Sequence, residues 1–151
     1  VEFINEAERY YLDSNFIINK IVLDIDTNCI NELIKDTHNF SKRELRSIRT
    51  KNTHIQYWTN KEFPKHKIFN YDSLWVVHKD NFVQVAREFD KLYKHKKIVS
   101  FSMPLFFRNY TYCIIYIKDG CGINCGSRRL VAYKKNGKKW KRVKTYCEWF
   151  S

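Results

Sequence analysis

Cysteine and glycine are concentrated in one short stretch of this chain, Gly120-Cys121-Gly122-Ile123-Asn124-Cys125-Gly126. Three residues separate Cys121 from Cys125, and this spacing among glycines is typical of a tight loop closed by a disulfide in an oxidising compartment. We therefore predict a bond between Cys121 and Cys125. A catalytic dithiol normally has two intervening residues, so the spacing argues against a redox site.

The other cysteines leave more than one arrangement open. Cys113 and Cys147 fall in the β-rich C-terminal part of the chain, whereas Cys29 stands alone. The four C-terminal cysteines allow three pairings, and we favour a second bond between Cys113 and Cys147 across neighbouring strands. The alternative is that all five are reduced and packed as small apolar side chains, as in a cytosolic protein.

The remaining chemistry-bearing residues form no familiar catalytic or metal-binding pattern. The five histidines are scattered and none is paired near a cysteine, so no zinc site is predicted. There is no Gly-x-Ser-x-Gly elbow, no phosphate-binding glycine-rich loop and no His-Glu-x-x-His motif. Asp24 and Asp26 are a conceivable carboxylate pair, although a solvated or capping role is commoner. We expect no metal, no cofactor and no catalytic residue, and an enzyme with an unrecognised site stays open as an alternative.

The excess of positive over negative charge is confined to the second half of the chain. Residues 1–75 hold 11 Lys and Arg against 11 Asp and Glu, whereas residues 76–151 hold 17 against 5, which accounts for the whole net charge of +12. A positive net charge that is concentrated in one part of the chain attracts acidic partners. A solvated lysine-rich surface is the plainer alternative.

The basic segment is predicted to be a β-hairpin, because Asn136-Gly137 is a strong signal for a two-residue type I′ turn. This turn pairs Tyr133 with Trp140, Leu130 with Val143, Val131 with Arg142, Lys134 with Lys139, Lys135 with Lys138, and Arg129 with Lys144. Like charges directly opposite each other cost up to ~1 kcal/mol per pair. The lysines either protect a sheet edge from self-association or form a docking face for an anionic partner. The predicted binding residues are Arg128, Arg129, Tyr133, Lys134, Lys139, Trp140, Arg142 and Lys144.

Apolar periodicity predicts helices in the first two thirds of the chain. A short helix should present Phe3, Ala7, Tyr10 and Tyr11 on one face, and Thr27 or Asn28 should cap a second one. Ser41-Lys42-Arg43-Glu44 is a capping box that starts a third. The clearest helix lies at 82–93, capped by Asp80 or Asn81. Residues 16–25 fit helix or strand, and 52–79 read as irregular strands and loops.

From residue 98 the pattern changes to that of strands, at 98–107, 110–117, 128–135 and 138–150. Short connections between them predict an antiparallel meander, with Pro104 at a bulge or an edge. The length suits one domain. We predict a single α+β domain over residues 1–151, with helices packed on one face of a C-terminal antiparallel meander of about four strands.

Several of these motifs occur together in residues 98–151. They are the run 98–106, the strand 112–117, the Cys-Gly-x-x-Cys-Gly element at 121–126, the basic turn at 134–141, and Trp149-Phe150-Ser151. In this combination the segment resembles a family of uncharacterised bacterial proteins that are often exported or lipid-anchored. Ser127-Arg128 stands where that family often has a glycine. The resemblance implies an exported α+β protein with paired loop cysteines, and it implies no activity.

Together these features favour a non-catalytic binding or accessory protein outside the cytoplasm, whether periplasmic, surface-anchored or secreted. Its basic ribbon would contact an acidic protein or a polyanion. Nucleic-acid binding is the first alternative, because Tyr133, Trp140 and Tyr146 interleave the charges as base-stacking platforms do. The absence of an 18-residue apolar run predicts no membrane span. The opening at Val1, without Met or a signal peptide, is consistent with a processed or truncated N-terminus.

Overall fold

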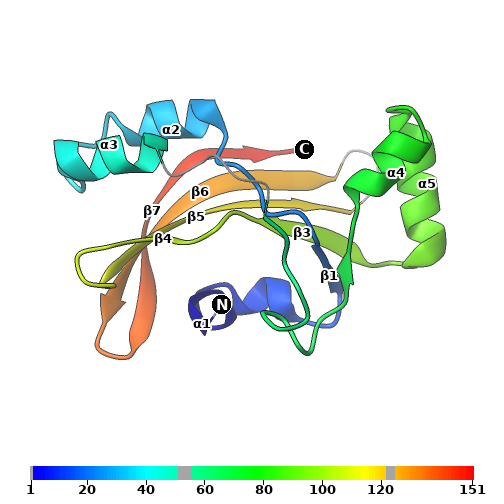
Figure 1. Ribbon diagram of the computed structural model, residues 1–151, viewed down its shortest axis with the longest axis horizontal. Helices are drawn as coiled ribbons and strands as arrows, with labels where there is room; N and C mark the ends of the chain where they lie inside the picture. Colours follow the sequence, from blue (N-terminus) through cyan, green and yellow to red (C-terminus); the bar gives the residue numbers. More distant parts are fainter. Residues whose placement is uncertain (1, 51–55, 122–124) are drawn as a thin grey trace.

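A seven-stranded mixed sheet forms the centre of the structure, a computed structural model that describes residues 2–50, 56–121 and 125–151 (Figure 1). The strands are β1 (Phe16–Asn19), β2 (Ile68–Phe69), β3 (Lys97–Phe101), β4 (Leu105–Phe107), β5 (Tyr112–Gly120), β6 (Gly126–Asn136) and β7 (Lys139–Phe150). The helices are α1 (Glu2–Ala7), the 3-10 turn η1 (Arg9–Leu12), α2 (Thr27–Leu33), α3 (Lys42–Thr50), α4 (Asp72–Val77) and α5 (Phe82–Leu92). The strand order is β2-β1-β3-β5-β6-β7, with β4 paired to β5.

The α+β class and the antiparallel C-terminal strands are confirmed, but the sheet is larger than the predicted four-stranded meander. β1 pairs in parallel with both β2 and β3 and so adds two strands at one edge. All four residues of β1 are buried, so the strand lacks the polar alternation by which a sheet with one solvated face is recognised. β2 has only two residues, which is too short for any periodicity.

The predicted strand 98–107 is divided into β3 and β4. The break falls at Ser102-Met103-Pro104, and Pro104 has no amide hydrogen with which to continue a ladder. Ser102 bridges the gap, since its amide donates to the carbonyl of Tyr116 and its Oγ accepts from the Tyr116 amide, both at 2.9 Å. β3 and β4 therefore pair in succession with one edge of β5.

Helices cover both faces of the sheet, not one face as predicted (Figure 1). We call the side covered by α1 and η1 the α1 face. Its sheet residues include Val99, Phe101, Cys113, Ile115, Ile117, Val131 and Tyr133, which pack with Phe3, Tyr11, Trp58 and Phe63.

We call the opposite side the groove face, because two helix pairs stand apart on it. α2 and α3 pack on Ile114, Tyr116, Leu130 and Ala132 at one end. α4 and α5 pack on Ile17 and Ile98 at the other end. Figure 1 shows the two pairs above opposite ends of the sheet, with α1 below it.

Local capping signals set the starts of α2, α3 and α5 close to the predicted positions, whereas α4 has no side-chain cap and lies in a segment predicted as irregular strands and loops. The Ser41–Glu44 capping box is confirmed: the Glu44 amide donates to Ser41 Oγ at 3.3 Å, and the Ser41 amide donates to Glu44 Oε2 at 2.8 Å. Asn81 caps α5 by accepting from the Gln84 amide. α2 is capped by Asp26, one residue before the expected position.

The predicted register of the β6–β7 hairpin is wrong. Gly137 has a φ of +60°, as predicted, but Asn136 does not, and it remains in β6 opposite Lys139. The two loop residues are Gly137 and Lys138, and a positive φ at the first central position alone is the pattern of a type II′ turn. None of the predicted pairs forms. Next to the turn, Lys135 lies opposite Trp140, Lys134 opposite Lys141, and Tyr133 opposite Arg142.

Two irregularities shift the register further along β7. The first brings Lys144 opposite Ala132, and the second brings Trp149 opposite Arg128. Cys147 lies within the second and has a φ of +47°. Because each bulge inserts an extra residue on one strand, it changes which side chains of β7 share a face with those of β6.

Candidate functional site

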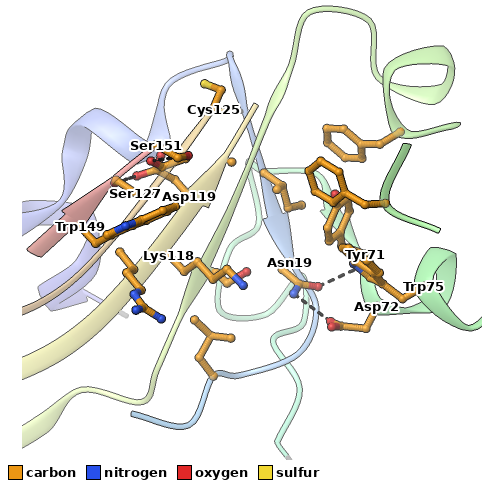
Figure 2. A pocket seen from close by; sticks show the side chains of 18 of the residues that line it. Asn19, Tyr71, Asp72, Trp75, Lys118, Asp119, Cys125, Ser127, Trp149 and Ser151 are labelled. Carbon is orange, nitrogen blue, oxygen red and sulfur yellow. Dashed lines mark hydrogen bonds between the residues drawn. The ribbon is translucent and has the colours of Figure 1, made fainter. Parts of the chain in front are cut away.

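A groove of about 1,010 Å³ lies on the groove face, over the part of the sheet that the helix pairs leave uncovered (Figure 2). Its floor is formed by β3, β5 and β6, and its wall by α4 and α5 with the residues before them. Figure 2 shows Asn19, Tyr71, Asp72 and Trp75 on one side and Trp149 on the other, with Lys118 between them.

The floor of the groove is a row of side chains that are register partners on successive strands. Ser100 on β3 lies opposite Lys118 on β5, Lys118 lies opposite Arg128 on β6, and Arg128 lies opposite Trp149 on β7. Directly opposed residues point to the same side of a sheet. The row therefore places a hydroxyl, two cations and an indole in line across four strands.

The two cations of this row differ in their partners. Arg128 forms an ion pair with Asp26 at the start of α2, at 3.3 Å, and its guanidinium lies 5.7 Å from the ring centroid of Trp149. Lys118 is exposed, and within the described part of the chain its ammonium makes no hydrogen bond or ion pair. Lys118 is thus a free cation beside a compensated one.

The bulge at Cys147 brings Trp149 to the groove. Tyr146 lies opposite Leu130 on the groove face, so a regular ladder would bring residue 148 to that face next. The extra residue of the bulge brings Trp149 to the groove face instead, and half of the Trp149 surface stays exposed. A disulfide between Cys147 and Cys29 of α2 fixes the bulge, with 5.1 Å between the Cα atoms, and the Cys147 amide donates to Glu32 at 2.7 Å.

The opposite wall is tied to the sheet through Asn19. Its buried side chain donates to Asp72 Oδ2 at 3.0 Å and accepts from the Tyr71 amide at 3.2 Å. These bonds hold the start of α4 beside β1. Trp75 and Phe82 follow along the wall, with 5.8 Å between their ring centroids.

The predicted bond between Cys121 and Cys125 is confirmed, and Cys125 lies at the end of the groove. The Cα atoms are 5.3 Å apart, and the Cys121 amide donates to the Cys125 carbonyl at 3.1 Å. Gly122, Ile123 and Asn124 of the predicted loop lie outside the described residues.

The predicted bond between Cys113 and Cys147 is wrong. β6 lies between β5 and β7, so the two residues are not on neighbouring strands. Cys113 is a free thiol buried on the α1 face, and this burial raises its pKa. Cys147 instead pairs with Cys29, which lies 118 residues away in the sequence.

The structure divides the predicted binding residues between the two faces and does not place them on one surface. Arg129 and Tyr133 are buried on the α1 face. Trp140 is partly buried beside Phe3, with 4.9 Å between ring centroids. Arg142 is exposed opposite Tyr133.

Arg129 belongs to a buried polar network. Its guanidinium donates to the hydroxyls of Tyr11 and Ser127, the latter at 3.3 Å. Both hydroxyls donate to Oδ2 of Asp119, at 3.0 and 2.6 Å. The Arg129 Nε is buried without a hydrogen-bond partner among the described residues. Two hydroxyls thus link a buried cation to a carboxylate beneath η1.

Tyr133 donates its hydroxyl to the neighbouring carboxylate of Glu8, which is also buried. Burial raises the pKa of Glu8, although the Tyr133 hydrogen bond and the charges of Arg129 and Arg142 act in the opposite direction. Burial, and then the Glu8 carboxylate, raises the pKa of Tyr133. Tyr133 is therefore part of the packing between α1 and the sheet.

The remaining predicted residues lie on the groove face. Arg128 is on the groove floor, and Lys134 and Lys139 are exposed near the hairpin tip. Lys144 donates to Asp36 Oδ2 at 2.8 Å, and Tyr146 donates to the same oxygen at 2.6 Å. Burial raises the pKa of Asp36, but hydrogen bonds from Lys144, Tyr146 and Asn39 outweigh burial and hold that pKa well below its usual range.

Sequence reasoning identified Arg128 but missed Ser100, Lys118, Trp149 and the aromatic wall. The only signal for Lys118 was its position after the apolar run of β5, and Trp149 depends on a bulge that no sequence pattern marked. Over residues 2–50, 56–121 and 125–151, no group of three His, Cys, Asp or Glu could hold a metal ion. No helix of these residues is long and apolar enough to cross a membrane.

Comparisons with protein-family models, with curated proteins and with solved structures returned no match to this chain.

Proposed function

We propose that the protein is a non-catalytic binding or accessory protein that acts outside the cytoplasm and contacts an acidic protein or polyanion through its β6–β7 hairpin. The observation that carries this proposal is a cluster of like charges near the hairpin tip. Lys134 lies opposite Lys141, and Lys139 follows on the same face. All three are exposed, and none forms an ion pair with a described residue. We call them the tip lysines.

The tip lysines oppose folding slightly, since a directly opposed like-charge pair costs up to ~1 kcal/mol. Elsewhere on β7 the chain compensates its charge, as where Lys144 meets Asp36 at 2.8 Å. Uncompensated cations on a projecting hairpin favour encounter with an anionic surface.

The location outside the cytoplasm is supported by two disulfides, because such bonds persist in oxidising compartments. The resemblance of residues 98–151 to exported bacterial proteins points the same way.

An acidic protein surface is favoured over nucleic acid because of where the aromatic residues lie. Tyr133 and Tyr146 are 2% and 1% exposed, so two of the three predicted stacking platforms cannot reach a base. Trp140 packs against Phe3 and Phe106.

The test is a triple variant, Lys134→Gln, Lys139→Gln and Lys141→Gln, titrated against fluorescein-labelled poly-L-glutamate. We expect about tenfold weaker binding at low salt, about 1.4 kcal/mol, and a smaller salt dependence. The matched control is Lys61→Gln, Lys65→Gln and Lys94→Gln, which removes the same charge from exposed lysines whose ammonium groups form no hydrogen bond or ion pair with a described residue. A single-stranded oligothymidylate serves as the second ligand.

Equal losses in the two triple variants would show that net charge alone drives binding. Unchanged binding with new self-association would show that the tip lysines protect an exposed edge, since β7 ends the sheet. If the oligonucleotide binds more tightly than poly-L-glutamate and its binding depends on the tip lysines, the partner is nucleic acid and not an acidic protein.

A further inference from the structure

We infer that the groove is a second binding site, separate from the hairpin tip, for a small organic carboxylate with a flat aromatic body. Three features of the groove carry this inference: its row of cations, its aromatic sides and its size.

The cations define the charge of the ligand. Lys118 and Arg128 are directly opposed on neighbouring strands, an arrangement that disfavours folding. Asp26 compensates Arg128 from the rim, but no described carboxylate reaches Lys118. A bound carboxylate over these residues would accept from the Lys118 ammonium and relieve the repulsion between the two cations. The Ser100 hydroxyl, on the other side of Lys118, offers a further donor on the same floor.

The aromatic side chains define the body of the ligand. Tyr71, Trp75 and Phe82 line one side of the groove, and the half-exposed Trp149 lines the other. Aromatic faces around a few fixed polar groups are the usual composition of a small-molecule site. Because Trp149 reaches the groove only through the disulfide-linked bulge at Cys147, its position there is fixed by the covalent structure.

The acidic residues of the groove define the orientation of the ligand. Asp72 and Asp80 lie on the helical side, where Asp72 accepts from Asn19. Asp119 also borders the groove, but its Oδ2 accepts from Tyr11 and Ser127 and its charge is balanced by the Arg129 network. A carboxylate would be repelled near α4 and attracted over Lys118, so the ring lies toward Trp75 and the anion toward β5 and β6.

The volume of about 1,010 Å³ is at the upper end of the range for small-molecule sites, ~300–1,000 Å³. A small molecule can therefore fill the groove without a polymer. The groove is also large enough for a natural ligand that is bigger than a bicyclic ring.

The experiment uses a matched pair of probes, naphthalene-2-carboxylate and 2-naphthamide, which share a ring system and differ in charge. Binding is measured by calorimetry and by quenching of tryptophan fluorescence. We expect the carboxylate to bind at least about tenfold more tightly than the amide. Lys118→Gln should remove this preference while leaving amide binding unchanged, and Lys118→Arg should retain it. Trp149→Leu should weaken both probes.

The control is Lys139→Gln, which removes one charge from the hairpin tip and should leave both probes unaffected. It also separates this inference from the proposed function, because the tip variants and Lys118→Gln act on different ligands. Equal affinity for the two probes would show that the groove binds the ring without recognising the carboxylate, and it would overturn the inference. A carboxylate preference that survives Lys118→Gln, or no binding of either probe, would also overturn it.

Discussion

Arg128 and Arg129 are consecutive residues that lie on opposite faces of the sheet, and they differ in burial and in their polar partners. Arg128 lies on the groove floor with 42% of its side chain exposed, paired with one carboxylate at the rim. Arg129 is 9% exposed on the α1 face and donates to two hydroxyls that both bind Asp119. The same contrast separates Lys118, free in the groove, from Asp119, fixed in the network.

The contrast shows how the role of a charge follows from its burial. A charge removed from water needs hydrogen bonds and a counter-charge, because its desolvation costs several kcal/mol. A buried charge that obtains its hydrogen bonds and counter-charge from the protein has little capacity left to bind a ligand. On the groove face water supplies the solvation, so Lys118 keeps its capacity to bind an anion. We therefore propose that the buried charges of the α1 face serve stability and that the uncovered part of the groove face serves binding.

The largest expected effect comes from deleting one arginine of each face. Arg129→Gln should lower the free energy of unfolding by about 3–5 kcal/mol, because it removes the cation that the Tyr11 and Ser127 hydroxyls link to Asp119 and takes a positive charge away from the buried Glu8. Arg128→Gln should lower it by less than about 1 kcal/mol, since the ion pair it breaks is exposed. Urea unfolding of the two variants measures both values. Similar losses in the two variants would remove the distinction between the faces.

The two disulfides provide a second comparison, within the groove face. Cys29→Ser with Cys147→Ser opens a loop of 118 residues, and we expect a loss of about 2–4 kcal/mol. Cys121→Ser with Cys125→Ser opens a loop of four residues, which restricts the unfolded chain far less, so its loss should be smaller. Urea midpoints of both double variants, with wild type under reducing conditions as the control, test this order. The reverse order would show that the short loop supports the sheet more than the link between α2 and β7.

Features set by residues within one turn of each other were predictable from the sequence. The Ser41–Glu44 capping box, the Asn81 cap, the positive φ of Gly137 and the Cys121–Cys125 bond are all of this kind. Each depends on backbone groups that are neighbours in any folded form of the segment. Placing the turn one residue too early still left Lys134 and Lys139 on one face, because the pairing moved by an even number of residues.

Features that depend on distant pairing were not predictable. The parallel strand β1 joins β3 across about 80 residues of sequence, and Cys29 reaches Cys147 only because α2 lies over β7. The groove row depends on three strand registers together, one of which is shifted by two bulges. Sequence reasoning therefore identified the basic segment but placed Arg129 and Tyr133 on its surface, although both lie on the face of β6 that η1 and α1 cover.

The smallest expected effect concerns how stability depends on pH. A carboxylate on the groove face and one on the α1 face should change the free energy of unfolding in opposite directions as the pH rises. On the groove face Arg108 donates to both carboxylate oxygens of Glu44, at 2.8 and 3.1 Å, and this pairing lowers the pKa of Glu44 from 4.5 to about 2. The unfolded chain then binds the proton more readily, so stability is full above pH 4.5 and is lost as the pH falls toward 2. Arg108 is 40% exposed, and with that screening we expect about 1–2 kcal/mol.

Glu8 on the α1 face should do the opposite. Burial raises its pKa, so the folded chain binds the proton more readily, and stability falls as the pH rises from 4.5 through the raised pKa. Urea unfolding between pH 2 and pH 8 should show that Glu44→Gln flattens the acid side of the stability profile, while its amide still completes the capping box. Glu8→Gln should flatten the profile above pH 4.5 and leave the acid side unchanged. If both variants flatten the same side, the two carboxylates share one environment and the contrast between the faces does not extend to their acids.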